Sequence, residues 1–262
     1  MKKFNVLMLI ISILFSIFIF FSLFYLFTSL RYGSLIIELL LSQKVWLALW
    51  VSVASSTIVV LISLLFGIPT SWMLANKDFK RKSIFETLIV DTPHSFPPSV
   101  VGTTYLLMFH PSNTFGALLS DLGINLVNSF WAMILVKTFV SAPFLISILT
   151  SKFREIRKNE IEIIAKSLGA SDFKCFRTIT LPLAKKALVA GSARCWARAL
   201  GEVAGTIVFA GAVIPGVTQT MPAIIVFEAQ ESLPEALTLA LILATFSVLV
   251  LVVFKLLMES DD

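Results

Sequence analysis

Residues 45–74 read VWLALWVSVASSTIVVLISLLFGIPTSWML and contain no charged side chain. A helix that crosses the hydrocarbon core of a bilayer needs about 20 predominantly apolar residues, so this stretch is predicted to span a membrane. Of the 262 residues of the chain, 57% are hydrophobic and 14% are charged, whereas about 25% of the residues of a soluble globular chain are charged. The composition therefore excludes an ordinary soluble enzyme, a disordered chain and a secreted disulfide scaffold.

Six segments are long and apolar enough to span a bilayer. They cover residues 5–30, 45–74, 86–109, 129–150, 187–213 and 235–257. The first follows Met1, Lys2 and Lys3, as in a signal peptide, but its apolar run exceeds the roughly 7–15 residues of such a peptide. We interpret it as a retained anchor helix. The prediction is an all-α polytopic membrane protein of six transmembrane helices, with an anchor helix and outer segment in residues 1–44 and one transmembrane domain in residues 45–257.

The distribution of basic residues predicts the orientation of the chain. Lys and Arg are concentrated in the cytoplasmic loops of membrane proteins. The loop 76–83 and the long segment 151–186 are rich in Lys and Arg, whereas the loops 110–128 and 214–234 contain neither. The two basic segments are therefore predicted to lie in the cytoplasm, together with both chain termini.

The cytoplasmic segment 151–186 is predicted to contain two short amphipathic helices. The first has an apolar face at the helical spacing i, i+3, i+4 and i+7, formed by Ile161, Ile164, Ala165 and Leu168. Gly169 is expected to end this helix, and Ser171 or Asp172 to cap the next one. The second helix, which is expected to end at Pro182, has an apolar stripe formed by Phe173, Phe176 and Ile179. The pattern fits either a surface element on the inner face of the membrane or a docking element for a soluble partner.

Residues 165–171 read AKSLGAS, and residues 179–182 read ITLP. A glycine followed by nine residues and then Ile-x-Leu-Pro resembles the EAA loop of ABC importer permeases. The Glu-Ala-Ala triplet of that loop is here Ile163-Ile164-Ala165, and the acidic residue stands one place earlier, at Glu162. The resemblance implies a type-1 permease fold in which the loop forms coupling helices that sit in a cleft of a separate ATPase subunit.

The resemblance also implies which residues carry the coupling. These are Glu162, Ala165, Leu168, Gly169, Ala170, Ile179, Leu181 and Pro182. ATP hydrolysis is expected on another chain, because this sequence contains no Gly-x4-Gly-Lys-Ser/Thr phosphate-binding loop. The chain is therefore expected to be a transport subunit and not an enzyme, without a catalytic residue or a cofactor of its own.

Three further stretches narrow the substrate class. Residues 97–102 read PPSVVG, residues 197–205 read ARALGEVAG and residues 218–222 read TQTMP. They are similar to the molybdate/tungstate permease subunits, which have Phe in place of Val203 and the order Gly-Ala in place of Ala204-Gly205. The resemblance implies a permease for an oxyanion, either molybdate/tungstate or, as a close rival, sulfate/thiosulfate. The candidate residues of the translocation path are Pro97, Pro98, Arg198, Glu202 and Thr220.

Charged residues inside the predicted spans need partners, because each costs about 2.5–3.5 kcal/mol at the bilayer centre on insertion scales. Arg194, Arg198 and Glu202 recur every four residues and share one helix face. Arg198 and Glu202 form either a structural ion pair or a site at which the arginine attracts a dianion. Lys137 in the fourth span is expected to face the bundle. The prolines in residues 93–98 indicate either a simple kink or a break that lines the path.

The resemblance implies a homodimer in the cell membrane of a prokaryote, with two ATPase subunits at the cytoplasmic loop and an extracytoplasmic binding protein. No nucleic-acid partner is expected, because basic clusters alternate with long apolar runs. Cys175 and Cys195 lie in different environments, so no disulfide is expected. His94 and His110 lack neighbours at metal-ligand spacing, so no metal site is expected. Two other classes remain open: a secondary transporter without an ATPase, and an intramembrane enzyme that uses Asp91 and His94.

Overall fold

The computed structural model describes residues 2–259, and within this range all regular secondary structure is helical. Four helices are long and apolar enough to cross a membrane. They are α1 (Lys2–Leu26), α3 (Gln43–Asn76), α8 (Phe130–Lys158) and α15 (Leu233–Glu259). These helices coincide with the first, second, fourth and sixth predicted spans, and the all-α membrane fold is confirmed.

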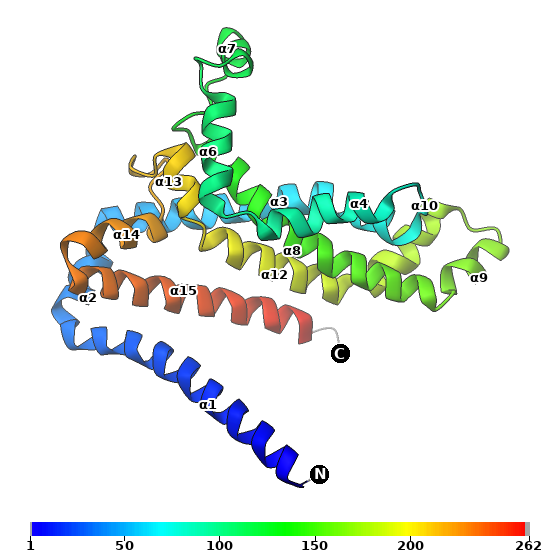
Figure 1. The fold of residues 1–262 in the computed structure, drawn as a ribbon, viewed down its shortest axis with the longest axis horizontal. Helices are drawn as coiled ribbons and strands as arrows, with labels where there is room; N and C mark the ends of the chain where they lie inside the picture. The colour runs from blue at the N-terminus through cyan, green and yellow to red at the C-terminus, as the bar shows by residue number, and fades with distance from the viewer. Residues whose placement is uncertain (1, 260–262) are drawn as a thin grey trace.

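The centre of the bundle is formed by α3, α8 and α12 (Lys185–Leu200), and α15 packs along α12 (Figure 1). Their shared core consists mainly of aliphatic and aromatic side chains, among them Val59, Leu145, Leu149, Phe153 and Trp196. Small residues let helices approach closely in membranes. A Cβ on Gly67 of α3 would lie 2.8 Å from a methyl carbon of Leu145 on α8, so the contact between these two helices depends on a glycine.

The third and fifth predicted spans are interrupted helices. The third consists of α4 (Lys82–Glu86), the π-helical turn η2 (Thr87–Asp91), α5 (Thr92–Ser95) and α6 (Pro98–Phe109). Between α5 and α6, Phe96 is extended (φ −77°, ψ 127°) because the following proline disfavours the helical region. The fifth consists of α12 and α13 (Ala204–Ala210), separated at residues 201–203.

After the first break the chain leaves the direction of the bundle. α6 and α7 (Thr114–Asp121) project from its side, roughly across the long helices (Figure 1). α13 packs against α6, and two glycines make the contact. A Cβ on Gly102 would lie 2.6 Å from the carbonyl oxygen of Gly205, and a Cβ on Gly205 would lie 2.6 Å from that of Pro98. Backbone therefore touches backbone where the two interrupted spans cross.

The N-terminal helix α1 stands apart from the bundle. It continues into η1 (Phe27–Tyr32) and α2 (Gly33–Leu41) and diverges from α15 along its length (Figure 1). The side chains of residues 4–25 are exposed in the isolated chain, and no part of the spanning window Phe4–Leu26 is buried. In a bilayer this apolar surface faces lipid or another helix. α2 and α14 (Met221–Glu231) lie at one end of the molecule, and α9 (Ile161–Ser167) and α10 (Asp172–Cys175) lie at the other (Figure 1).

We expect the Gly102→Ala substitution to destabilise the fold, because the added methyl group would overlap the backbone of Gly205. Overpacking of this kind costs about 1–3 kcal/mol. Thermal unfolding of the purified protein in detergent measures the effect. Gly33→Ala is the control, since a Cβ at Gly33 meets no atom within 4 Å. Equal melting temperatures for the two variants would contradict the close approach of α6 and α13.

Candidate functional site

The two helices predicted in the segment 151–186 form a helical hairpin at one end of the bundle. This element, residues 161–183, is here called the hairpin. Its first arm is α9, and its second arm consists of α10, the π-helical turn η3 (Phe176–Thr180) and α11 (Leu181–Leu183). The predicted helix end at Pro182 is wrong. Pro182 lies in the first turn of α11, where a missing N–H is tolerated, and the chain continues into α12.

Gly169 ends the first arm, as predicted. Its φ of +89° is in the left-handed region, which glycine adopts without a steric penalty. The N–H of Gly169 donates to the carbonyl of Lys166 at 2.9 Å, and the N–H of Ala170 donates to the carbonyl of Ala165 at 3.0 Å. This is the Schellman pattern of a helix C-terminus. The turn between the arms is therefore fixed by backbone hydrogen bonds.

Side chains also join the two arms. The buried Thr180 hydroxyl donates a hydrogen bond to Glu162, whose exposed fraction is only 8%. Lys166 and Asp172 form an ion pair across the turn at 2.8 Å. This pair lowers the pKa of the Asp172 carboxyl and raises the pKa of the Lys166 amine, so both groups are charged at neutral pH. Ser171 caps α10, as predicted, by accepting a backbone N–H at 3.3 Å. Glu162 thus lies inside the hairpin and not on its surface.

Aromatic packing attaches the hairpin to the spans. Phe176 packs edge-to-face against Trp72 of α3, with 6.2 Å between ring centroids, and against Phe153 of α8, at 6.3 Å. The neighbouring Cys175 is buried and free. Phe173, the first residue of the predicted apolar stripe, is in contrast exposed. A displacement of the hairpin would therefore act directly on α3 and α8.

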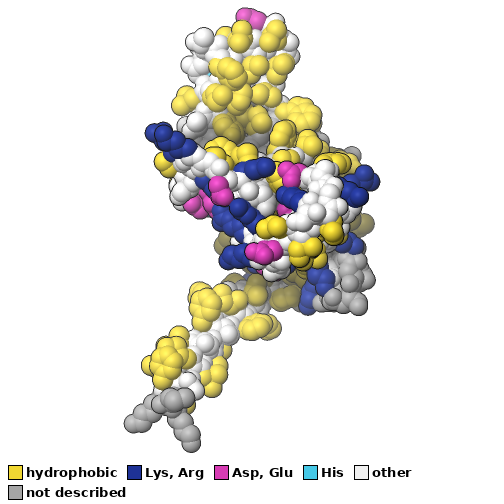
Figure 2. All heavy atoms as spheres, turned by 90° about the vertical axis from the view of Figure 1, so that its right-hand side faces the viewer, with side chains coloured by type: hydrophobic (Ala, Val, Ile, Leu, Met, Phe, Trp, Pro, Cys, Tyr) yellow, Lys and Arg dark blue, Asp and Glu magenta, His cyan; other side chains and the backbone are white. Residues whose placement is uncertain are grey.

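The outer surface of α9 is apolar. Leu168 is 85% exposed, and Ile163 and Ile164 are also exposed. Figure 2 views this end of the molecule and shows hydrophobic side chains among those of Lys and Arg. Among the remaining predicted coupling residues of the two arms, Pro182 is exposed. The other four are half-buried: Ala165, Ala170, Ile179 and Leu181. Contiguous exposed apolar residues with a polar rim are typical of an interaction site.

Glu202 organises the break between α12 and α13, and its side chain is almost fully buried. One carboxylate oxygen accepts a hydrogen bond from the Arg198 guanidinium at 3.1 Å. The other accepts the backbone N–H of Gly205 at 2.8 Å, one of the donors that the first turn of a helix leaves without an intrahelical partner. The predicted Arg198–Glu202 ion pair is confirmed. Because 31% of the Arg198 side chain remains exposed, this guanidinium is both paired and accessible.

Lys137 faces the bundle, as predicted, and is fully buried. Its ammonium donates a hydrogen bond to the Ser55 hydroxyl of α3 at 2.8 Å, and that hydroxyl donates to the carbonyl of Ser52 at 3.1 Å. The Ser52 hydroxyl accepts the backbone N–H of Met221 at 2.9 Å. This network joins α8, α3 and the first turn of α14. Sequence reasoning missed the two serines, although their spacing of three residues inside an apolar span was a signal.

The other candidate path residues lie beside these two polar groups. Pro97 and Pro98 mark the start of α6, and the carbonyl of Pro98 faces Gly205. The N–H of Gly205 in turn donates to the Glu202 carboxylate. Thr220 is fully buried and is the N-cap residue of α14, next to the Lys137 network. Four of the five candidates therefore meet at the crossing of the two interrupted spans, and the fifth lies at the N-terminus of α14.

The chain has several apolar spans, two of which are interrupted around buried polar groups, and a hairpin at one end of the bundle. These features define a multi-pass membrane protein with the fold of a type-1 ABC importer permease. Residues 67–259 match the family described as the binding-protein-dependent transport system inner membrane component. The chain belongs to this family, whose members are transport subunits and not enzymes in their own right.

Curated relatives extend the similarity. The chain is 30% identical over 233 residues to the probable transport system permease protein NifC of Clostridium pasteurianum, covering 88% of this chain and 80% of NifC. It is 35% identical over 159 residues to the molybdate/tungstate transport system permease protein WtpB of Thermococcus kodakarensis, covering 61% of this chain and 58% of WtpB. It is 33% identical over 175 residues to the sulfate transport system permease protein CysW of Escherichia coli K12, covering 67% of this chain and 59% of CysW. The matches to WtpB and CysW thus span little more than half of those proteins.

Solved structures share the fold. A chain of the bacterial alginate ABC transporter, in complex with an alginate pentasaccharide-bound periplasmic protein, has a TM-score of 0.69 to this chain at 17% identity. The similarity covers 97% of this chain and 91% of that one. The overall fold is therefore retained at low sequence identity.

We expect Ser55→Ala to destabilise the protein more than Ser56→Ala. The first change removes the hydroxyl that accepts from the buried Lys137 ammonium, and an unsatisfied buried donor costs about 1–3 kcal/mol, or more when charged. The second removes a hydroxyl that donates only within α3, to the carbonyl of Ser52. Thermal unfolding in detergent measures both. Equal stability of the two variants would contradict a stabilising role for the Lys137–Ser55 hydrogen bond.

Proposed function

We propose that this chain is the membrane subunit of an ATP-driven importer for an oxyanion, with molybdate or tungstate as the substrate. The observation that carries the importer function is the hairpin: a rigid element at one end of the bundle, seated on α3 and α8, with an apolar outer surface. The motifs in residues 97–102, 197–205 and 218–222 and the similarity to WtpB support the choice of substrate.

The proposed assembly contains two copies of this chain, two ABC ATPase subunits docked on the hairpin and an extracytoplasmic binding protein. The hairpin and both termini would lie in the cytoplasm, and the chain in the cell membrane of a prokaryote. The basic loops and the direction of α15, which runs from the α14 end toward the hairpin end (Figure 1), support this orientation. Residues 45–257 would form the transmembrane domain, with its coupling loop at 151–186, and residues 1–44 the anchor helix and outer segment.

In the proposed mechanism, ATP-driven closure of the ATPase subunits displaces the hairpin as one body. The apolar face of α9 and the turn at Gly169 would make the contact, while Glu162, through Thr180, would keep the two arms together. Phe176 would pass the displacement to α3 and α8. Packed helices respond to such a push by rigid-body rotation, since well-packed interfaces have discrete arrangements. The path would then alternate between outward-facing and inward-facing states.

Arg198 is the proposed anion contact on the path. Its guanidinium is partly exposed at the break, while Glu202 offsets its charge. This arrangement attracts a dianion but keeps its binding weak enough for release, which conduction requires. Lys137 lies fully buried in the same bundle. Pro97 and Pro98 would line the break, and Thr220 would offer its hydroxyl at the start of α14.

Uptake measurements test the substrate. Vesicles that contain the chain, its ATPase subunit and its binding protein are supplied with ATP and with labelled molybdate, tungstate or sulfate. We expect ATP-dependent uptake of molybdate and tungstate. Sulfate uptake without tungstate uptake would favour the sulfate/thiosulfate alternative, which the similarity to CysW supports.

The same vesicles separate the two other classes. Uptake that an ion gradient drives without the ATPase would favour a secondary transporter. An intramembrane enzyme would need Asp91 and His94 as a pair, but His94 is hydrogen-bonded to the carbonyl of Val90 at 2.7 Å and packs against Phe144. Substitution of Asp91 and His94 is therefore expected to leave ATP-driven uptake in place.

We expect Gly169→Val to lower both ATPase capture and ATP-driven uptake by about tenfold. A β-branched residue is strongly disfavoured at φ +89°. Placing a residue that has a side chain in this left-handed region costs about 1–2 kcal/mol, and about 1.4 kcal/mol corresponds to a tenfold change. Gly123→Val is the matched control, because Gly123 also has a positive φ (+78°) and no atom within 4 Å of an added Cβ, but lies in the loop after α7. Equal losses in both variants would contradict the proposed role of the hairpin turn.

A further inference from the structure

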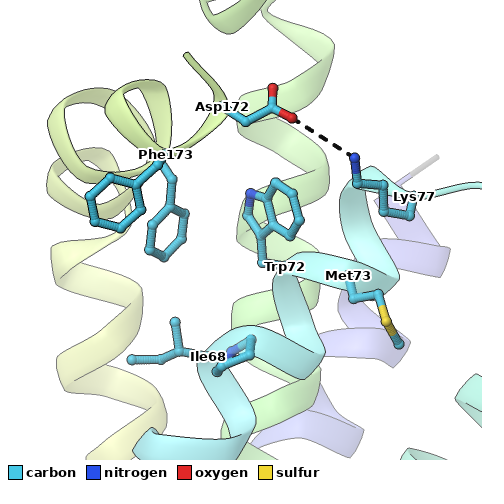
Figure 3. A pocket seen from close by; sticks show the side chains of 8 residues that line it. Ile68, Trp72, Met73, Lys77, Asp172 and Phe173 are labelled. Carbon is cyan, nitrogen blue, oxygen red and sulfur yellow. Dashed lines mark ion pairs between the residues drawn. The ribbon is translucent and has the colours of Figure 1, made fainter.

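A groove separates the end of α3 from the second arm of the hairpin (Figure 3). Its volume is about 660 Å³, within the range of about 300–1,000 Å³ that is usual for small-molecule sites. Ile68, Trp72 and Met73 form one wall, and Phe173 and Phe176 form the other. Apart from the Trp72 nitrogen, these lining side chains are apolar.

The rim of the groove carries a surplus positive charge. Asp172 and Lys77 face each other there at 4.0 Å, the dashed contact of Figure 3. Asp172 is held much closer by Lys166, at 2.8 Å, and the pKa of its carboxyl is lowered chiefly by that hydrogen bond. One carboxylate thus serves two lysines. Lys77, which also lies 5.3 Å above the Trp72 ring, is therefore available to a further anion.

The groove lies where α3 is predicted to leave the bilayer. Lys77 directly follows the last residue of α3, Asn76, and is the first charged residue after the apolar run 45–74. The apolar wall on α3 lies about one to two and a half helical turns before Lys77, on the side of the hydrocarbon core. A free phosphate ion would gain nothing from these walls, whereas an acyl chain would be buried by them.

We propose that this groove binds a phospholipid with an anionic headgroup, with its phosphate at Lys77 and an acyl chain between α3 and the hairpin. Basic pockets beside membrane-spanning helices on the cytoplasmic side are suited to such headgroups. The lipid would lie against Trp72 and Phe176, the aromatic pair that seats the hairpin on α3. It would therefore fill the space beneath the hairpin and support its position. The inference does not depend on which oxyanion is transported.

Native mass spectrometry of the full chain tests the proposal. The purified chain is titrated in detergent with phosphatidylglycerol or phosphatidylcholine of the same acyl chains, and the bound lipid is counted. We expect phosphatidylglycerol to be retained in preference, and Lys77→Gln to lower its retention roughly fivefold, the effect of about 1 kcal/mol for one basic residue near a membrane surface. Lys77→Arg, which keeps the charge, is expected to retain the lipid.

Lys80→Gln is the matched control, because Lys80 is an exposed lysine of the same loop outside the groove. Equal losses in Lys77→Gln and Lys80→Gln, or equal binding of the two lipids by the unaltered chain, would overturn the proposal. Phe173→Ser is a second test variant, since it removes part of an apolar wall without changing the charge. It is also expected to weaken retention of phosphatidylglycerol. If Lys77→Gln instead weakened capture of the ATPase subunit and left lipid retention unchanged, the groove would be a protein contact and the proposal would be wrong.

Discussion

The hairpin depends on one hydrogen bond that is shielded from water, from the Thr180 hydroxyl to the Glu162 carboxylate. A buried carboxylate is tolerated only when it is hydrogen-bonded, so this bond allows Glu162 to stay buried between the closed arms of the hairpin. The Schellman turn at Gly169 fixes the same two arms at their other end. Both ends of the hairpin are closed and Phe176 packs on the spans, so the hairpin is a single packed unit, which the coupling role proposed above requires.

The same constraint shapes the bundle. Polar groups at membrane depth must be satisfied by the protein itself. Glu202 does this at the break after α12, where it binds both Arg198 and a backbone N–H. Lys137 and Ser55 satisfy each other by a hydrogen bond between α8 and α3. The Glu202 set joins the consecutive helices α12 and α13 across their break, whereas the Lys137 set joins α8 to α3, which are far apart in sequence. The bundle can therefore contain charges and a helix break without losing its packing.

Much of this could be predicted from local sequence. The spans follow from apolar length, the hairpin turn from Gly169, and the Arg198–Glu202 pair from its four-residue spacing. Other features depend on residues far apart in the chain. Ser55 and Lys137 are 82 positions apart, and Gly102 meets Gly205 only because both spans are interrupted. The helical spacing of Ile161, Ile164 and Leu168 marks an apolar face, but this spacing alone does not say which surface would cover it. The helix end predicted at Pro182 was wrong, because this proline follows a π-helical turn and lies in the first turn of α11, where the chain continues.

Cross-linking from Leu168 tests the central claim most directly. Both native cysteines are buried, so a Leu168→Cys variant presents an accessible thiol on the hairpin in the complex with the ATPase subunit. Our account predicts that a short thiol-reactive cross-linker joins this position to the ATPase subunit. It also predicts that Leu122→Cys, which is likewise exposed but lies in the loop after α7, gives no such product. An uptake-competent complex in which Leu168→Cys never cross-links to the ATPase subunit would contradict the account.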